Sequence, residues 1–325
     1  MSKKNTQAQT ASAETANVKK VYDFCAKKKV ILGILIGVLA ALVIGIIARG
    51  VDLAIEFKGG TIISYTYQGD VDTKAVSDTV KSIVNTSITV RTGESLDSDA
   101  KQITISFTSN EGLTADRQTE LTNALRENFA DNDFTLYDSN DVAPTSGREF
   151  LLKCLVAVIF AAIVVIIYIA IRFRNIGGWS AGVCSVFALL HDILVAVTVT
   201  ILFGFEFNSN LVAVILTILG YSINNTIVIY DRIREDRKLM AKASLDELIN
   251  VSCTQSLTRS IRTSITTIST MLIVTIVVLI KGYDSLLSFS VPLMFGLISG
   301  TYSSLFVAPV TWSWWKNKQA KKSSK

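Results

Sequence analysis

The sequence predicts an α-helical, polytopic membrane protein with six transmembrane helices and one small α+β domain between the first two helices. The first observation is composition: 50% of the 325 residues are hydrophobic and 18% are charged, whereas a soluble domain carries about 25% charged residues. The second is a set of six apolar runs, each reaching the bilayer-spanning length of about 18 residues with few charges. The third is an uneven distribution of charge. Residues 52–149 hold 17 acidic and 8 basic residues and the remainder holds 10 acidic and 24 basic, so the net charge of +5 is not that of one homogeneous domain.

The apolar runs divide the chain from end to end. They are Val30–Ala48, Cys154–Ile171, Gly177–Phe203, Leu211–Tyr230, Thr263–Ile280 and Ser285–Trp312. Core helices of a soluble protein would be shorter and would have polar faces, so membrane spans are the better interpretation. The expected division is a disordered tail at 1–29, a first span at 30–49, the α+β domain at 50–150, five spans at 151–314 with an amphipathic surface loop at about 231–258, and a basic tail at 315–325.

Lysine and arginine predict the orientation, because short cytoplasmic loops are enriched in both. They cluster before the first run and after the second, fourth and sixth runs, whereas the link Gly204–Asn210 has none. Both termini are therefore expected in the cytoplasm, with the acidic domain outside the cell membrane. Because the positive charge lies in short strips beside apolar runs, a nucleic-acid partner is not expected.

The domain at 50–150 alternates strand and helix patterns. β-branched and aromatic residues predict four strands, at Thr61–Tyr67, Ile88–Arg91, Gln102–Phe107 and Phe134–Tyr137. Apolar residues at helical spacing predict helices at Thr73–Ile83 and Leu113–Phe129. The order strand, helix, strand, strand, helix, strand indicates a ferredoxin-like fold, which serves many functions and defines none of them.

The sequence contains no recognisable catalytic or metal-binding pattern. It has no P-loop, no HExxH motif and no nucleophile–base signature. The four cysteines match no metal spacing and are interpreted as small buried hydrophobic residues or incidental thiols; they are Cys25, Cys154, Cys184 and Cys253. Neither an enzymatic activity nor a cofactor is expected, so any energy would come from an ion gradient or from a partner.

Ionisable residues inside a span are candidate functional groups, because a charge at mid-bilayer costs about 2.5–3.5 kcal/mol on insertion scales. His191 and Asp192 lie together near the middle of the third run, and His191 is the only histidine of the chain. Two interpretations stay open. The pair is either a proton or ion relay or a hydrogen-bonded contact that holds the helix bundle together.

The fourth run carries an unusually polar stretch from Gly220 to Thr226. Gly220 and Asn224 are four residues apart and share one helix face, as small and amide residues do at close helix contacts. Simple adhesion between helices would explain this pattern without any transport role.

Two arginines precede the fifth run. Arg259 and Arg262 are three residues apart and lie on one flank of a helix. They are either interfacial arginines that touch lipid headgroups or, if the membrane begins earlier, partners of Asp192 or Asp231. An ion pair at about 4 Å would gain on the order of 4 kcal/mol at an effective dielectric constant of about 20.

Four motifs resemble signatures of the SecD/SecF family of protein-export membrane proteins. The segment IEFKGGT at 55–61 is similar to the family's IDFKGGT, and LHD at 190–192 is similar to its HD pair. The stretch at 220–235 resembles GYSIND followed by FDRIRE, and the stretch at 256–267 resembles TLSRTIxTSLTT. The resemblance assigns signature positions to Glu56, Gly59, Gly60, Gly220 and Arg232, and ion-coupling positions to His191, Asp192, Asn224, Asn225, Asp231 and Arg259. Six spans and one short outer domain resemble the smaller partner of that family rather than SecD.

The resemblance implies a function. Such a protein pairs with SecD in a twelve-helix bundle of the resistance-nodulation-division type, and it associates with the SecYEG channel and often with YajC in the bacterial plasma membrane. With the proton gradient it helps to pull unfolded exported polypeptides outward at a late stage of export. Two alternatives are a half-transporter of the same superfamily for a small hydrophobic molecule and a scaffold subunit that uses no energy.

One position departs from the family pattern. The last residue of the family's SIND motif, an Asp implicated in proton transfer, is Asn225 here, and an amide does not titrate. Arg259 matches the family's functional arginine, so the resemblance implies that it is the counter-charge to an Asp of SecD while Asn225 forms hydrogen bonds only. Coupling to sodium is the alternative.

Overall fold

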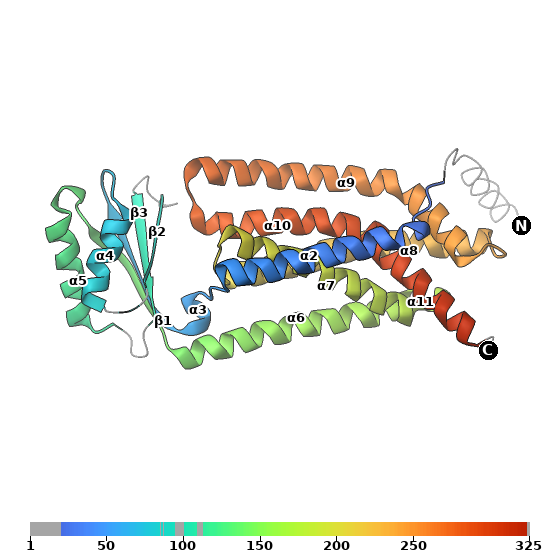
Figure 1. The fold of residues 1–325 in the computed structure, drawn as a ribbon, viewed down its shortest axis with the longest axis horizontal. Helices are drawn as coiled ribbons and strands as arrows, with labels where there is room; N and C mark the ends of the chain where they lie inside the picture. The colour runs from blue at the N-terminus through green and yellow to red at the C-terminus, as the bar shows by residue number, and fades with distance from the viewer. Residues whose placement is uncertain (1–20, 85, 87, 95–100, 109–112, 324–325) are drawn as a thin grey trace, which may run out of the picture.

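The protein is elongated, with a sheet at one end of a long helix bundle (Figure 1). The computed structural model describes residues 21–84, 86, 88–94, 101–108 and 113–323. In that part of the chain six helical segments are long and apolar enough to cross a membrane, as the sequence predicts. Most of the expected tail at 1–29 and part of the turn between the second and third strands lie outside the described residues.

The sheet domain (residues 60–142) has the predicted order of elements. They are β1 (Gly60–Tyr67), α4 (Thr73–Val84), β2 (Ile88–Glu94), β3 (Lys101–Phe107), α5 (Ala115–Asn128), η2 (Ala130–Asn132) and β4 (Thr135–Val142). The strands pair antiparallel in the order β2-β3-β1-β4, so the ferredoxin-like prediction is confirmed. β4 extends five residues beyond the predicted end at Tyr137.

One face of the sheet carries the core of this domain. Alternate residues of β1 and β3 are fully buried, including the paired Ile63 and Ile105, because side chains alternate across a strand. They pack against Val80 of α4 and Leu121 of α5, and both helices lie on the side of the sheet that faces away from the bundle (Figure 1). The opposite, more polar face is therefore turned toward the bundle.

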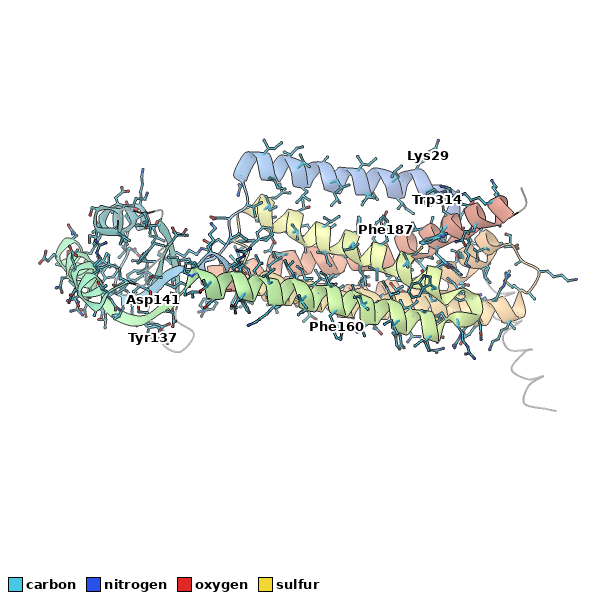
Figure 2. The ribbon with its side chains drawn as sticks, turned by 90° about the horizontal axis from the view of Figure 1, so that it is seen from below. Lys29, Tyr137, Asp141, Phe160, Phe187 and Trp314 are labelled. Carbon is cyan, nitrogen blue, oxygen red and sulfur yellow. The ribbon has the colours of Figure 1, made fainter. Side chains whose placement is uncertain are left out.

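The bundle contains the six spans. They are α2 (Lys28–Arg49), α6 (Pro144–Arg172), α7 (Gly178–Phe203), α8 (Ser209–Leu239), α9 (Leu245–Lys281), and a last span made of α10 (Asp284–Tyr302), the π-helix η4 (Ser303–Val307) and α11 (Ala308–Ser323). Shorter elements join them, namely η1 (Cys25–Lys27), α3 (Ile55–Lys58) and η3 (Arg174–Ile176). Figure 2 places Lys29 of α2 and Trp314 of α11 at the end of the bundle far from the sheet.

The spans divide into an inner and an outer group. The share of the most apolar stretch that is buried is 50% for α7, 39% for α8 and 67% for the last span. The same share is 6% for α2, 6% for α6 and 11% for α9. The outer helices expose apolar side chains such as Phe160 of α6, which points away from the bundle (Figure 2). Lipid or partner helices would cover such faces, and α7, α8 and α10 form the packed centre.

The surface loop predicted at about 231–258 is not a separate surface helix, and this prediction is wrong. α8 continues to Leu239 and α9 already begins at Leu245, where the Ser244 side chain accepts a hydrogen bond from the Glu247 amide at 3.2 Å. Such a capping bond is a strong helix start signal. Apolar residues of this stretch, such as Leu248, pack in the core rather than on a membrane surface.

The last residues of the predicted disordered tail also differ from expectation. Phe24 and Cys25 are buried, and both of their backbone amides donate to Asn250 Oδ1, at 2.9 and 3.1 Å. These contacts attach the start of α2 to α9, so residues 24 and 25 belong to the bundle.

Candidate functional site

Asp192 lies in the centre of the bundle and is fully buried. Ser299 Oγ donates to its Oδ1 at 2.6 Å, and the hydroxyls of Ser222 and Ser303 donate to its Oδ2 at 2.7 and 2.6 Å. In the described part of the chain no lysine or arginine nitrogen lies within 4.0 Å of this carboxylate. Asp192 therefore joins α7, α8 and the last span through hydroxyl groups, and we call Asp192 with these three serines the carboxylate cluster.

His191 adjoins the carboxylate cluster. Its Nδ1 lies 3.5 Å from Asp192 Oδ1 and 3.3 Å from Ser299 Oγ. Its Nε2 is buried and has no hydrogen-bond partner among the described residues. The ring packs beside Tyr302, with 6.0 Å between the ring centroids. His191 therefore has one nitrogen beside the cluster and one without a described partner.

The π-helix η4 begins at Ser303, beside Asp192. A π-turn shifts the register of a helix locally, and such turns are frequent at functional sites. Here the turn lies where the last span meets the carboxylate, and Ser299 and Ser303 both reach Asp192 from this part of the span.

A second set of hydroxyls borders this cluster. Tyr221 Oη donates to Ser264 Oγ at 3.0 Å, and Thr301 Oγ1 donates to the same oxygen at 2.8 Å. Ser264 lies in the serine- and threonine-rich stretch of α9, so the contact extends the polar layer from α7 to α9. Four helices thus share one polar layer within an otherwise apolar bundle.

The polar stretch of α8 faces in two directions. Asn225 is buried, 5% exposed, and its Nδ2 has no hydrogen-bond partner among the described residues. Asn224 and Gly220 are exposed, and no atom of another described segment lies within 4 Å of the position that a Cβ on Gly220 would occupy. The close helix contact expected for Gly220 and Asn224 is therefore not made among the residues that the structure describes.

Two hydrogen bonds fix how α8 and α9 lie side by side. Tyr221 pairs with Ser264, and Arg232 Nε donates to Gln255 Oε1 at 2.6 Å. Because the partner's number falls as the α8 number rises, the helices are antiparallel. Interpolation between the two contacts puts Arg259 level with about Ile227, roughly 3 Å along the axis from Asn225.

Arg259 lies in an open groove between α8 and α9. The groove has a volume of about 770 Å³, and its polar lining includes Asp231, Arg232, Glu235 and Thr258. Arg259 is exposed, and in the described part of the chain no carboxylate lies within ion-pair distance of it. The structure thus brings Arg259 near the level of Asn225 but turns the two side chains to different environments.

The acidic partners considered for Arg259 are engaged elsewhere. Asp192 accepts from serines, and Asp231 pairs with Arg172 at 3.1 Å and with Arg234 at 2.7 Å. Of the two interpretations of Arg259, the ion pair with Asp192 or Asp231 is therefore not made among the described residues. The physical reason is geometric, because Arg172 at the end of α6 and Arg234 one turn along α8 reach Asp231.

Arg232 belongs to the same end of α8. It lies 3.4 Å from Glu235 and 3.4 Å from the fully buried Asp236, whose Oδ2 also accepts from Ser252 Oγ at 2.7 Å. The charged signature at 231–236 thus ties α6, α8 and α9 together at the end of the bundle far from the sheet.

The glycine signature connects the sheet domain to the bundle. Gly59 has φ +85, and a Cβ there would lie 2.5 Å from Pro144 Cα at the start of α6. Gly60 has φ +144, and a Cβ there would lie 2.3 Å from the Phe107 carbonyl oxygen. Only glycine combines such dihedrals with such close backbone contacts. Glu56 precedes them, and its Oε2 accepts a hydrogen bond from the Ser209 amide at 2.8 Å, at the first residue of α8.

Sequence reasoning missed the serines of the last span. Ser299 and Ser303 are four residues apart in an apolar helix, and this hydroxyl spacing was the available signal. It also missed the contact between Arg91 of β2 and Glu206 of the loop between α7 and α8, at 3.1 Å. Nothing in the sequence brings those two residues together. No group of three or more metal-ligating side chains occurs among the described residues.

Six spans around a polar layer, with a ferredoxin-like domain inserted after the first span, define a polytopic membrane protein of the transport and translocation class. The family model for "Protein export membrane protein SecD/SecF, C-terminal" matches residues 121–318, which is more than half of the chain. The chain belongs to the SecD/SecF family.

Relatives are similar along most of the chain. The protein translocase subunit SecF of Petrotoga mobilis is 32% identical over 289 residues, covering 88% of this chain and 93% of that protein. SecF of Alicyclobacillus acidocaldarius is 34% identical over 283 residues, covering 85% of this chain and 87% of that protein. The translocase subunit SecDF of Bacillus subtilis is 40% identical over 186 residues, which is 56% of this chain and 24% of that longer protein.

Solved structures share the fold. The crystal structure of SecDF from Thermus thermophilus, described as a translocon-associated membrane protein, is 28% identical with a TM-score of 0.75 and covers 93% of this chain. SecDF in a super-membrane-facing form matches with a TM-score of 0.66 and 27% identity over 94% of this chain. This chain spans about two fifths of those SecDF chains, 39% and 40%.

These relatives support an auxiliary role in Sec translocation. SecDF unites in one chain the two names of the family, which supports pairing of this chain with a SecD partner. They also support a place in a membrane, in agreement with the six apolar helices. The names of the relatives describe translocase subunits and no catalytic reaction.

Proposed function

We propose that this chain is an auxiliary subunit of the Sec protein translocase that, together with a SecD partner, uses an ion gradient to promote late-stage export of unfolded polypeptides. In this proposal the subunit works beside the SecYEG channel and YajC in the bacterial plasma membrane, with both termini in the cytoplasm and the sheet domain outside. Lysine and arginine at the end of the bundle far from the sheet support this orientation.

The observation that carries the proposal is the open polar face that α8 and α9 share. We define this face by the exposed residues Asn224, Arg259, Arg262, Thr263 and Thr266. An exposed arginine beside an apolar span is costly unless water or an opposite charge reaches it. Small and polar residues are also those that membrane helices use to associate. A partner helix with an acidic residue would complete this face.

The departure from the family pattern at Asn225 decides which subunit carries the titrating group. The amide does not carry a proton, so the titrating acid belongs to the partner, and Arg259 is its counter-charge. One proton that crosses about 100 mV releases about 2.3 kcal/mol. That energy is enough to shift a two-state equilibrium by nearly fiftyfold, since each 1.4 kcal/mol is a factor of about ten.

His191 and Asp192 have a second part in the proposal. The carboxylate cluster joins three inner helices, so a change in its charge would alter the packing of all three. We assign to the carboxylate cluster the transmission of movement from the open polar face through the bundle. To Asp231 and Arg232 we assign the anchoring of the helices at the end of the bundle far from the sheet.

Export measured with each gradient collapsed separately tests the proposal. Precursor processing in cells that depend on this subunit should slow when the proton gradient is collapsed and persist when only the sodium gradient is collapsed. The reverse result would replace protons by sodium. If export is unchanged when either gradient is collapsed, while the subunit still assembles with its SecD partner, only the scaffold function would remain.

A further inference from the structure

An ion pair joins the sheet domain to the bundle in the part of the chain that the structure describes. Arg91 Nη2 of β2 lies 3.1 Å from Glu206 Oε1 in the loop between α7 and α8. Among the ion pairs of the described residues, this is the one that joins a strand of the sheet to the bundle. The contact therefore influences how the domain is oriented on the membrane helices.

Backbone contacts fix Glu206 to the bundle. The next residue, Phe207, donates its amide to the Asp52 carbonyl at 2.7 Å, and its own carbonyl accepts from the Ala54 amide at 2.9 Å. Glu56 then accepts from the first amide of α8. Glu206 is therefore followed directly by residues held in place at the start of α8, the helix that carries Asn225.

The two members of this ion pair, which we call the joint, differ in how far they are shielded from water. The side chain of Glu206 is 15% exposed, whereas that of Arg91 is 32% exposed, so the carboxylate has lost more water than its partner. A cavity of about 200 Å³ adjoins the pair, between the polar sheet face and the bundle. Tyr283 lies at its edge, and the other charged groups near Glu206 are Asp52, Glu56 and Lys58. The desolvated Glu206 carboxylate therefore has one arginine partner, with two further acids and one lysine nearby.

We propose that Arg91 and Glu206 are positioning residues that seat the sheet domain on the bundle, and that neutralising Glu206 seats it more firmly. The reason is that an ionised carboxylate loses solvation when the domain docks, and a single partly exposed arginine restores only part of it. The neutral acid loses much less on docking.

The direction of the pH dependence follows from linkage. Burial raises the pKa of Glu206 above its ordinary value of 4.5, and this effect exceeds the opposing effect of Arg91. The docked form, with the higher pKa, binds the proton more readily than an undocked form in which the side chain is hydrated. Acidification therefore favours docking, and the response begins at a pH above the ordinary carboxyl pKa.

This inference goes beyond the proposed function. If the sheet domain faces the outside, as proposed above, protons that accumulate there would seat the domain over α8. The chain would then possess a proton-responsive group of its own at the membrane surface, separate from Asn225.

A distance measurement on the full-length chain in lipid nanodiscs tests the joint. Spin labels on E120C in α5 and K281C at the end of α9, with Cys154 replaced by serine, report the distance from domain to bundle. The wild type should show at least a twofold rise in the ratio of docked to undocked populations between pH 8 and pH 5.5. E206Q should remain docked at both pH values.

Two further variants complete the test. R91Q should lower the docked ratio at pH 8 at least threefold and should recover at pH 5.5. K101Q removes an exposed ion pair with Asp70 in the same domain and should behave as wild type. Loss of docking in E206Q at pH 8, or an R91Q distribution identical to wild type, would overturn the inference. Neither result depends on export, so this experiment can fail without affecting the test of the proposed function.

Discussion

The two polar regions of the bundle differ in how far this chain completes them. Around Asp192, three serines of α8 and of the last span satisfy the carboxylate, and the group is fully buried. Around Arg259, the groove between α8 and α9 is open and its guanidinium has no acidic partner among the described residues. The carboxylate of the first region is satisfied within this chain, and the second region is open at the surface of the described chain. The comparison teaches that the buried carboxylate contributes mainly to the stability of the bundle, whereas the open groove is available to a partner.

The largest expected effect is on the closed region. Asp192→Leu removes the carboxylate that accepts from three buried hydroxyls, and a buried polar group left unsatisfied costs about 1–3 kcal/mol. We expect the free energy of unfolding in micelles to fall by about 3–5 kcal/mol, measured by denaturant titration. Ser269→Ala, on an exposed position of α9, is the control. Equal stability of Asp192→Leu and wild type would show that the cluster does not hold the bundle together.

The opposite pattern is expected at the open region. Arg259→Ala removes a charge that makes no ion pair within the described chain, so the free energy of unfolding should change by less than about 0.5 kcal/mol. Export should fall at least about tenfold, which corresponds to about 1.4 kcal/mol. Arg259→Lys, which keeps the charge, should retain more export than Arg259→Ala. Normal export by Arg259→Ala in an assembled complex would remove ion coupling through this subunit.

Asn225 lies between the two regions and should matter less than either. Its amide nitrogen has no described hydrogen-bond partner, so Asn225→Ala should cost only about 1 kcal/mol of stability from lost packing. Because the amide carries no proton, export should stay within about threefold of wild type. A loss of export as large as that of Arg259→Ala would place the coupling group on α8 of this chain.

The smallest effect is expected at the far end of the bundle. Arg172 and Asp231 are each 36% exposed, and exposed ion pairs contribute about 0–1 kcal/mol. Arg172→Gln should therefore lower the free energy of unfolding by about 0.5 kcal/mol, since Arg234 still pairs with Asp231. The loss should shrink in high salt. A loss above about 2 kcal/mol would mean that this end, rather than the carboxylate cluster, holds the helices together.

The sequence predicted the fold well because its signals are local. Six apolar runs locate the six spans, and alternation in Thr61–Tyr67 locates β1. The stretch after Asp231 is harder to predict because its apolar residues have the same period on a membrane surface and in a helix pair. The capping bond at Ser244 and the contacts of Arg232 with α9 decide between the two.

The site was less predictable because its contacts are long-range. His191 and Asp192 were identified as candidates by their place in an apolar run, yet the donors to Asp192 lie 30, 107 and 111 residues away. Arg259 was identified from a motif, and its outward direction follows only from the packing of α8 against α9. Serine is common in membrane helices, so Ser299 and Ser303 gave a weak signal on their own.

The central claim is that a SecD partner covers the open polar face. A photoreactive phenylalanine analogue at Thr263 of this face, compared with the same analogue at Phe160 on the apolar surface of α6, tests it directly. In membranes that contain the SecD partner, we predict a crosslinked product of the two subunits from position 263 and little or none from position 160. A product from position 160 alone, or none from position 263 in an assembled complex, would contradict the account.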